Sequence, residues 1–147
     1  MRNVKKTDAF WDSSAMVPLC VGQAASSFAS AAMRNRSITV WWGTSVEMTS
    51  AFARLHRSGD ISHRSFRMAV ARLANLRGMW IEVQPTESVR DLAEALVQRH
   101  PLRAADAMQL AAALIWSNRQ TRNRAFVCFD GRLAEAAVKE GFTVEAI

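Results

Sequence analysis

Cysteine and histidine, which build most zinc sites in proteins, are scarce in this chain. Its 147 residues include two cysteines, Cys20 and Cys128, and three histidines. The cysteines lie far apart and form no metal-binding spacing, so we predict two small buried residues that a cytoplasmic chain keeps reduced. The histidines, His56, His63 and His100, form no recognisable catalytic pair. A zinc site, a disulfide framework and histidine-based catalysis are therefore all disfavoured.

Long apolar runs are absent as well. No window reaches the roughly 18 uninterrupted apolar residues of a membrane span. The apolar stretch at 104–116 is broken by Asp106 and Gln109. The first residues are basic, but Asp8 and Asp12 interrupt the segment that follows, so no signal peptide is expected. We predict a cytoplasmic protein that has no membrane partner.

Basic residues outnumber acidic residues in this chain. The 19 Lys and Arg against 13 Asp and Glu leave a formal net charge of +6, which favours polyanionic partners such as nucleic acid. Half of the chain is apolar, which excludes a disordered protein. The chain contains no repeat, low-complexity tract or interdomain linker. We therefore expect a single domain over residues 1–147 with a real hydrophobic core.

Apolar, β-branched and aromatic runs alternate with amphipathic stretches along the chain. The runs predict strands, and the stretches with helical spacing predict helices. The expected strands cover 8–12, 37–42, 80–83, 125–129 and 143–146, and the expected helices cover about 14 onward, 23–34, 44–58, 61–76, 86–100, 103–118 and 131–141. This alternation predicts an α/β fold with three α/β/α layers and a central, mostly parallel sheet.

A helical pair is inserted between the second and third predicted strands, at roughly 44–77. It is strongly basic, so it is a candidate RNA clamp or simply a solvated helix surface. Its basic residues are Arg54, His56, Arg57, Arg64, Arg67, Arg72 and Arg77.

Four acidic residues sit where apolar runs give way to helices: Asp12, Glu47, Asp106 and Asp130. Because the carboxyl ends of parallel strands share one edge of a sheet, we expect these carboxylates to gather there. At about 5 Å and an effective dielectric near 20, each pair would cost roughly 3 kcal/mol. Hard cations such as Mg²⁺ or Mn²⁺ relieve that repulsion. The pattern predicts an acidic metal site.

Each of these acids also has a simpler interpretation. Asp12 and Asp130 could be N-caps, which accept hydrogen bonds from free helix N–H groups. Thr44 and Glu47 match a capping box, and Asp106 in a first helical turn gains from the helix dipole. Caps need no partner elsewhere in the chain, however, whereas all four acids fall on the same predicted edge.

Four segments resemble those of PIN-domain ribonucleases, most closely the VapC-type toxins of toxin–antitoxin pairs. They are DSSAM at 12–16, TSVE at 44–47, PLRAADAMQLA at 101–111 and FDGRLAEAA at 129–137. Their order and spacing cover nearly the whole chain, and the third is the most specific. Two departures accompany the resemblance. Residues 1–7 form an N-terminal extension, and Cys128 stands where the family often has Ser or Thr.

The resemblance implies a PIN-like fold and a Mg²⁺- or Mn²⁺-dependent endoribonuclease. The family's metal-binding and catalytic acids carry over to Asp12, Glu47, Asp106 and Asp130, and its catalytic hydroxyl carries over to Ser14. It also implies an RNA substrate, a cognate antitoxin and a homodimer. No further cofactor is expected.

Two other classes of function stay open. The chain could be a non-catalytic RNA-binding or scaffolding domain whose acids are helix caps. It could also be a phosphotransfer enzyme on a similar sheet. A phosphatase-like first strand would want a second acid where Ser14 stands, and a receiver-like domain would want a paired acid beside the first strand's carboxylate.

Overall fold

The described part of the chain contains five strands and seven helices. The computed structural model describes residues 7–22 and 26–145; the predicted extension up to residue 6 and the predicted helix start at Gln23 lie outside these ranges. The strands are β1 (Thr7–Trp11), β2 (Arg36–Trp41), β3 (Ile81–Val83), β4 (Ala125–Val127) and β5 (Thr143–Glu145). The helices are α1 (Ser13–Val21), α2 (Ser26–Asn35), α3 (Thr44–Arg57), α4 (His63–Arg77), α5 (Glu87–Arg99), α6 (Ala104–Trp116) and α7 (Gly131–Lys139).

The strands form one parallel sheet in the order β3-β2-β1-β4-β5. The central strand β1 pairs with both β2 and β4, with Phe10 opposite Thr39 on one side and Phe126 on the other. Because every described strand runs in the same direction, the residues that follow β1, β2 and β4 emerge at the same edge. The predicted parallel sheet is confirmed.

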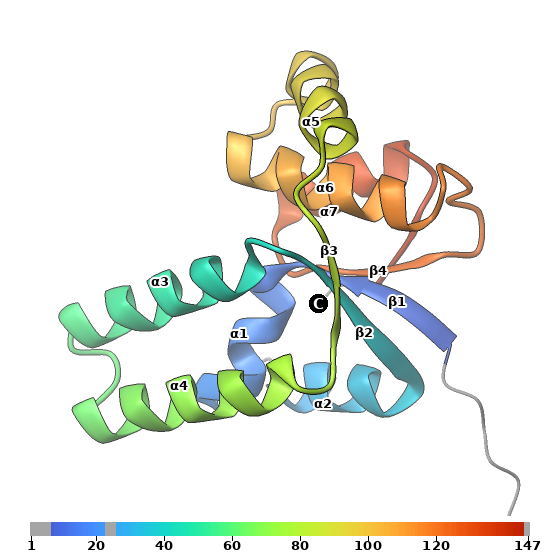
Figure 1. The fold of residues 1–147 in the computed structure, drawn as a ribbon. Helices are drawn as coiled ribbons and strands as arrows, with labels where there is room; N and C mark the ends of the chain where they lie inside the picture. Colours follow the sequence, from blue (N-terminus) through green and yellow to red (C-terminus); the bar gives the residue numbers. More distant parts are fainter. Residues whose placement is uncertain (1–6, 23–25, 146–147) are drawn as a thin grey trace, which may run out of the picture.

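Helices cover both faces of the sheet (Figure 1). Alternate residues of one strand point to opposite faces. Trp11 therefore joins the core beneath α1 to α4, whereas Phe10 joins the core beneath α5, α6 and α7. The same alternation separates Val127 from Phe126 on β4. These two cores make the three α/β/α layers that were predicted, and the inserted helical pair is α3 and α4.

Most predicted element ends lie within two residues of the observed ones, as is usual for frayed helix and strand ends. Helix α4 begins at His63, not at 61, because the Ser62 side chain caps it by accepting from the Ser65 N–H. Strand β4 ends at Val127 although the apolar run continues to Phe129. Both cysteines are buried and free, as predicted.

Within the residues described, no helix combines the length and the apolar character needed to cross a membrane.

Candidate active site

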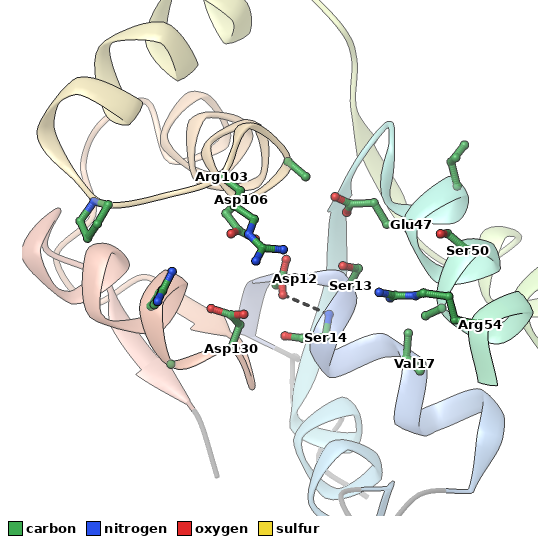
Figure 2. Close-up of a pocket in the computed structure, with 16 residues that line it drawn as sticks. Asp12, Ser13, Ser14, Val17, Glu47, Ser50, Arg54, Arg103, Asp106 and Asp130 are labelled. Atoms are coloured by element: carbon green, nitrogen blue, oxygen red, sulfur yellow. Dashed lines mark hydrogen bonds between the residues drawn. The ribbon is translucent and has the colours of Figure 1, made fainter. Parts of the chain in front are cut away.

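A cleft of about 860 Å³ opens at the carboxyl edge of the sheet (Figure 2). All five predicted site residues line it: Asp12, Ser14, Glu47, Asp106 and Asp130. They come from four segments that are distant in the sequence. The parallel sheet brings these segments together, because β1 and β4 end at this edge and α3 and α6 begin beside it.

Asp12 lies at the bottom of the cleft, directly after β1. Its side chain caps α1 by accepting from the Ser14 N–H at 3.0 Å, and its own N–H donates to the Val127 carbonyl at 3.0 Å. Only 3% of the residue is exposed. The N-cap interpretation is therefore correct for Asp12. The side chain of an ordinary N-cap residue is in contact with solvent, however, whereas that of Asp12 is not. A carboxylate this deeply buried requires a further explanation.

The capping box predicted for Thr44 and Glu47 is wrong. Helix α3 begins at Thr44, its N-cap is Gly43, and no side chain caps it. Glu47 is consequently one position too far along the helix to reach the N-cap N–H. Its carboxylate instead accepts a hydrogen bond from the Gln109 Nε2, which also donates to Thr44 Oγ1 at 3.0 Å. Glu47 is turned toward the cleft and caps nothing.

Asp106 and Asp130 line the α6–α7 side of the cleft. Asp106 is in the first turn of α6, where a hydrogen bond from the Arg103 backbone supports its charged form. Asp130 caps α7 by accepting from the Leu133 N–H at 3.0 Å. Both residues thus have a local structural role. Neither role explains why the two carboxylates share one cleft with Asp12 and Glu47.

Burial and mutual repulsion disfavour the charged forms of Asp12, Glu47 and Asp106. Burial raises the pKa of Asp12 from 3.8 to about 6, and the charge of Asp106 adds to the rise although hydrogen bonds from Ser14 oppose it. Burial likewise raises the pKa of Glu47 from 4.5 to about 7; the hydrogen bond from Gln109 opposes the rise, and the charges of Asp12 and Asp106 increase it. Two carboxylates therefore titrate close to neutral pH.

Burial also raises the pKa of Asp106, and the charge of Asp130 contributes to that rise. Arg103 and Arg132 act in the opposite direction, because their positive charges favour the ionised carboxylate. The acids of the cleft thus perturb one another, as the predicted clustering requires.

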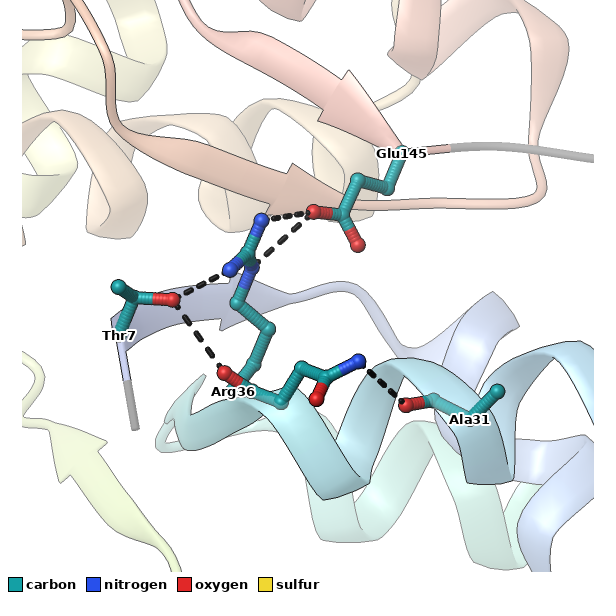
Figure 3. A network of polar contacts seen from close by, with 5 residues as sticks. Thr7, Ala31, Arg36 and Glu145 are labelled. Carbon is teal, nitrogen blue, oxygen red and sulfur yellow. Dashed lines mark hydrogen bonds and ion pairs between the residues drawn. The ribbon is translucent and has the colours of Figure 1, made fainter. Parts of the chain in front are cut away.

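Among the described carboxylates, Glu87, Glu135, Glu140 and Glu145 form ion pairs, whereas none of the four cleft acids does. Several exposed acids, such as Asp91 and Glu94, also form none, but they do not share a cleft. Glu145 accepts from the Arg36 guanidinium at 2.6 and 3.0 Å, within a network that includes Thr7 (Figure 3). Glu140 pairs with Arg99 and lies 2.9 Å from the His100 Nε2. Glu140 is only partly exposed.

The chemistry of the cleft fits a hard divalent cation, since four carboxylates without paired cations are the ligands that Mg²⁺ and Mn²⁺ prefer. As the side chains stand, however, no three His, Cys, Asp or Glu side chains in the described ranges form a group tight enough to hold a metal ion. Direct coordination by three of them would require side-chain rotation. Coordination through water, which Mg²⁺ commonly retains, requires less movement.

Cys128, two residues before Asp130, contacts Asp12 and Ser14. Its Sγ lies 3.9 Å from Asp12 Oδ2 and 3.8 Å from Ser14 Oγ. Burial and the nearby Asp12 charge raise the pKa of the thiol to about 12, so it stays a neutral thiol. Ser14 Oγ also accepts from the Phe129 N–H at 2.9 Å, which fixes the start of α1 to the segment after β4.

Several cleft residues were not predicted as site residues. Ser13 lines the cleft, and its side chain hydrogen-bonds Glu47, although Ser14 was the expected hydroxyl. Gln109, on α6, donates a hydrogen bond to Glu47, and its buried Oε1 has no hydrogen-bond partner among the described residues. The three-residue spacing from Asp106 to Gln109 puts both on one helix face, and it could have indicated that Gln109 lies near the site. Three arginines also line the cleft: Arg54, Arg103 and Arg132.

No histidine lines the cleft in the residues described. His56 packs against Phe66, with ring centroids 5.2 Å apart, and against His63 at 5.6 Å. His100 is engaged with Glu140. Histidine-based catalysis at this site is therefore disfavoured, as the sequence indicated.

No protein-family model matches this chain, and no curated protein matches it. Among solved structures, the chain is similar to a toxin-antitoxin complex from Klebsiella pneumoniae. The two are 16% identical, the TM-score is 0.60, and the match covers 86% of this chain and 90% of that chain. At this identity the similarity supports the three-layer fold.

Proposed function

We propose that the protein is a Mg²⁺- or Mn²⁺-dependent endoribonuclease of the PIN-domain, VapC-like type, acting as the toxin of a toxin–antitoxin pair. The observation that carries the proposal is the set of four carboxylates in one cleft without ion-pair partners among the described residues. A protein gains no stability from such a set, since burial, together with the charges of the neighbouring acids, raises the pKa of Asp12 to about 6 and that of Glu47 to about 7. A binding or catalytic role explains it.

Each side chain has a role in this proposal. Asp12 and Asp106 are the central ligands of the cation, and Glu47 and Asp130 complete the set directly or through water. The chemistry that a bound Mg²⁺ or Mn²⁺ supplies is activation of a water molecule and stabilisation of the leaving oxygen. Ser14 orients a water or a phosphate oxygen. Its oxygen accepts from the Phe129 N–H, and its side chain hydrogen-bonds the Asp12 carboxylate and lies 3.8 Å from the Cys128 sulfur.

The positioning of Glu47 depends on Gln109 and Ser13. Gln109 Nε2 donates to Glu47, and both donors favour the charged form of a carboxylate that burial would otherwise keep protonated. A charged Glu47 is needed to hold a cation. Gln109 and Ser13 are therefore positioning residues in the proposed reaction.

Besides the RNA substrate, the proposed toxin role implies two protein partners, an antitoxin and a second copy of this chain. The neighbouring structure is a toxin-antitoxin complex, and its fold similarity, together with the resemblance in sequence, supports a cognate antitoxin for this chain. An antitoxin segment that placed a cationic side chain among the carboxylates would block the cleft. A homodimer, which the resemblance also implies, belongs to the same proposal.

The alternative is a non-catalytic RNA-binding or scaffolding domain whose acids are helix caps. The caps formed by Asp12 and Asp130 favour it. Glu47 argues against it, because this partly buried acid caps no helix and is held toward the cleft. Binding of Mn²⁺ separates the two functions, since caps alone bind it weakly.

The test is RNA cleavage by purified, partner-free protein. A structured RNA should be cut with Mg²⁺ or Mn²⁺ and left intact with EDTA, and sequencing of the new 5′ ends should show discrete sites. Asp106→Asn should abolish cutting, while Asp91→Asn, which changes an exposed acid on α5, should not. Robust cleavage in excess EDTA would sink the metal mechanism. Tight RNA binding without cleavage or Mn²⁺ binding would support the alternative.

A further inference from the structure

Three arginines line the carboxylate cleft and are not used by the proposed chemistry. Arg103 precedes α6 and Arg132 lies in the first turn of α7, on the side of the cleft that carries Asp106 and Asp130. Arg54 lies in the last turn of α3, on the opposite side, beyond Ser13 (Figure 2). The cleft thus has arginines on two sides, Arg103 and Arg132 on the α6–α7 side and Arg54 on the α3 side, and we call these its two banks.

These arginines have no ion-pair partner among the described residues, unlike several others. Arg36 pairs with Glu145, and Arg99 pairs with Glu140. Arg103 and Arg132 are near enough to Asp106 to lower its pKa by their charge, but neither forms a salt bridge with it. Their guanidinium groups are exposed and available to an anion at the mouth of the cleft.

Helix energetics do not explain the positions of Arg103 and Arg132. A helix N-terminus carries a partial positive charge, so a cation placed there is unfavourable. Arg103 is at the N-cap position of α6 and forms no side-chain capping bond, and Arg132 is two residues beyond the N-cap of α7. The position of Arg54 near a helix C-terminus is favourable by itself. What Arg54 shares with the other two is the cleft.

We propose that the two banks are phosphate-binding subsites on either side of the scissile bond, so that one RNA strand crosses the cleft from Arg54 to Arg103 and Arg132. This inference rests on the proposed function, because it assigns the path of the substrate through the same site. Guanidinium groups match phosphate oxygens in geometry and charge. They also offset the repulsion between an approaching phosphate and the carboxylates. The cleft volume of about 860 Å³ suits a short single-stranded segment.

The test is the salt dependence of RNA binding in EDTA, where neither cleavage nor metal binding contributes. The protein carries Asp12→Asn, which removes one repelling charge, and the probe is a short fluorescein-labelled single-stranded RNA followed by fluorescence anisotropy. Each lost phosphate contact should lower the slope of log K against log salt by about 0.7. Arg54→Ala should therefore lower it by about 0.7, and so should Arg103→Ala with Arg132→Ala, because these two arginines form one subsite.

Additivity tests whether there are two subsites. If the banks contact different phosphates, the triple variant should lose about 1.4 units of slope, the sum of the two separate losses. A triple variant that loses no more than the double variant would mean one shared phosphate and would overturn the two-subsite proposal. The matched control is Arg119→Ala with Arg122→Ala, because neither residue forms an ion pair among the described residues. It removes the same charge from exposed residues that lie outside the cleft lining, and its slope should be unchanged.

The outcomes separate this inference from the proposed function. Unchanged slopes in the Arg54 and Arg103/Arg132 variants, or no RNA binding at low salt, would overturn the subsites even if the wild type cleaves RNA normally. Reduced slopes in a protein that never cleaves RNA would support the subsites and count against the nuclease. All these arginines are exposed, so circular dichroism should show folded variants.

Discussion

Replacing Asp12 by Asn should stabilise the metal-free protein at neutral and alkaline pH. Asn caps helices about as well as Asp, so the bond from the Ser14 N–H can persist. The substitution removes a buried charge whose pKa is raised from 3.8 to about 6. A difference of about two pKa units corresponds to about 3 kcal/mol. That free energy is the cost of keeping Asp12 ionised in the folded state, beside Asp106.

The sign of the pH dependence follows from the direction of the shift. Because the folded pKa of Asp12 lies above the unfolded value, the ionised group destabilises the fold. The penalty is absent below about pH 4, grows between about pH 4 and 6, and is complete above that. Asp12→Asn should therefore match the wild type near pH 4 and exceed its unfolding free energy by up to about 3 kcal/mol at pH 8.

The assay is urea denaturation of both proteins in EDTA at pH 4 and pH 8, repeated at pH 8 with saturating Mn²⁺. Added Mn²⁺ should stabilise the wild type far more than the variant, since a ligand stabilises the folded state that binds it. Asp91→Asn is the control, and a change at this exposed site should stay within about 0.5 kcal/mol. If Asp12→Asn is less stable than the wild type at pH 8 in EDTA, the claim of a repulsive buried carboxylate is refuted.

Three further outcomes are expected. Gln109→Leu removes a hydrogen-bond donor to Glu47 and should raise the pKa of Glu47 further. The Mn²⁺ affinity measured by calorimetry should therefore fall at pH 7 and recover at pH 9, and an equal loss at both pH values would contradict this role of Gln109. Asp130→Ala should lower the unfolding free energy in EDTA by about 1 kcal/mol because the N-cap of α7 is lost, whereas Asp130→Asn should not. Both variants should cleave RNA more slowly, and intact cleavage would mean that Asp130 is only a cap. Arg64→Ala with Arg67→Ala, on the exposed side of α4, should weaken RNA binding and flatten its salt slope, and an unchanged slope would leave this helix to a protein partner.

The sequence was sufficient to predict that the strands run parallel and which edge of the sheet carries the acids, but not the strand order β3-β2-β1-β4-β5. The alternation of apolar runs and amphipathic helices requires parallel strands with crossover helices, and parallel strands end at one edge. Asp12 and Asp130 each follow a strand end that the sequence marks clearly. Their places at the cleft are consequences of the chain order.

The contacts that tune the site could not be predicted in this way. Gln109 and Glu47 are separated by 62 residues, and only the packing of α6 against the start of α3 brings their side chains together. The choice between Ser13 and Ser14 depends on the rotation of α1 about its axis, which the cap at Asp12 fixes. A local motif such as Thr-x-x-Glu also does not say where a helix begins. A shift of one residue in that start turned an expected capping bond into a side chain that faces the cleft.

The most direct test of the central claim is a titration of RNA cleavage with Mn²⁺, compared with Mn²⁺ binding to the same protein. We predict that the initial rate is zero in EDTA and rises with Mn²⁺ to saturation. Its midpoint should agree with the binding midpoint measured by calorimetry. In Asp12→Asn both binding and cleavage should be lost while the fold is retained. Cleavage that persists in EDTA, or that survives in Asp12→Asn at the wild-type rate, would contradict a metal-dependent site built on these carboxylates.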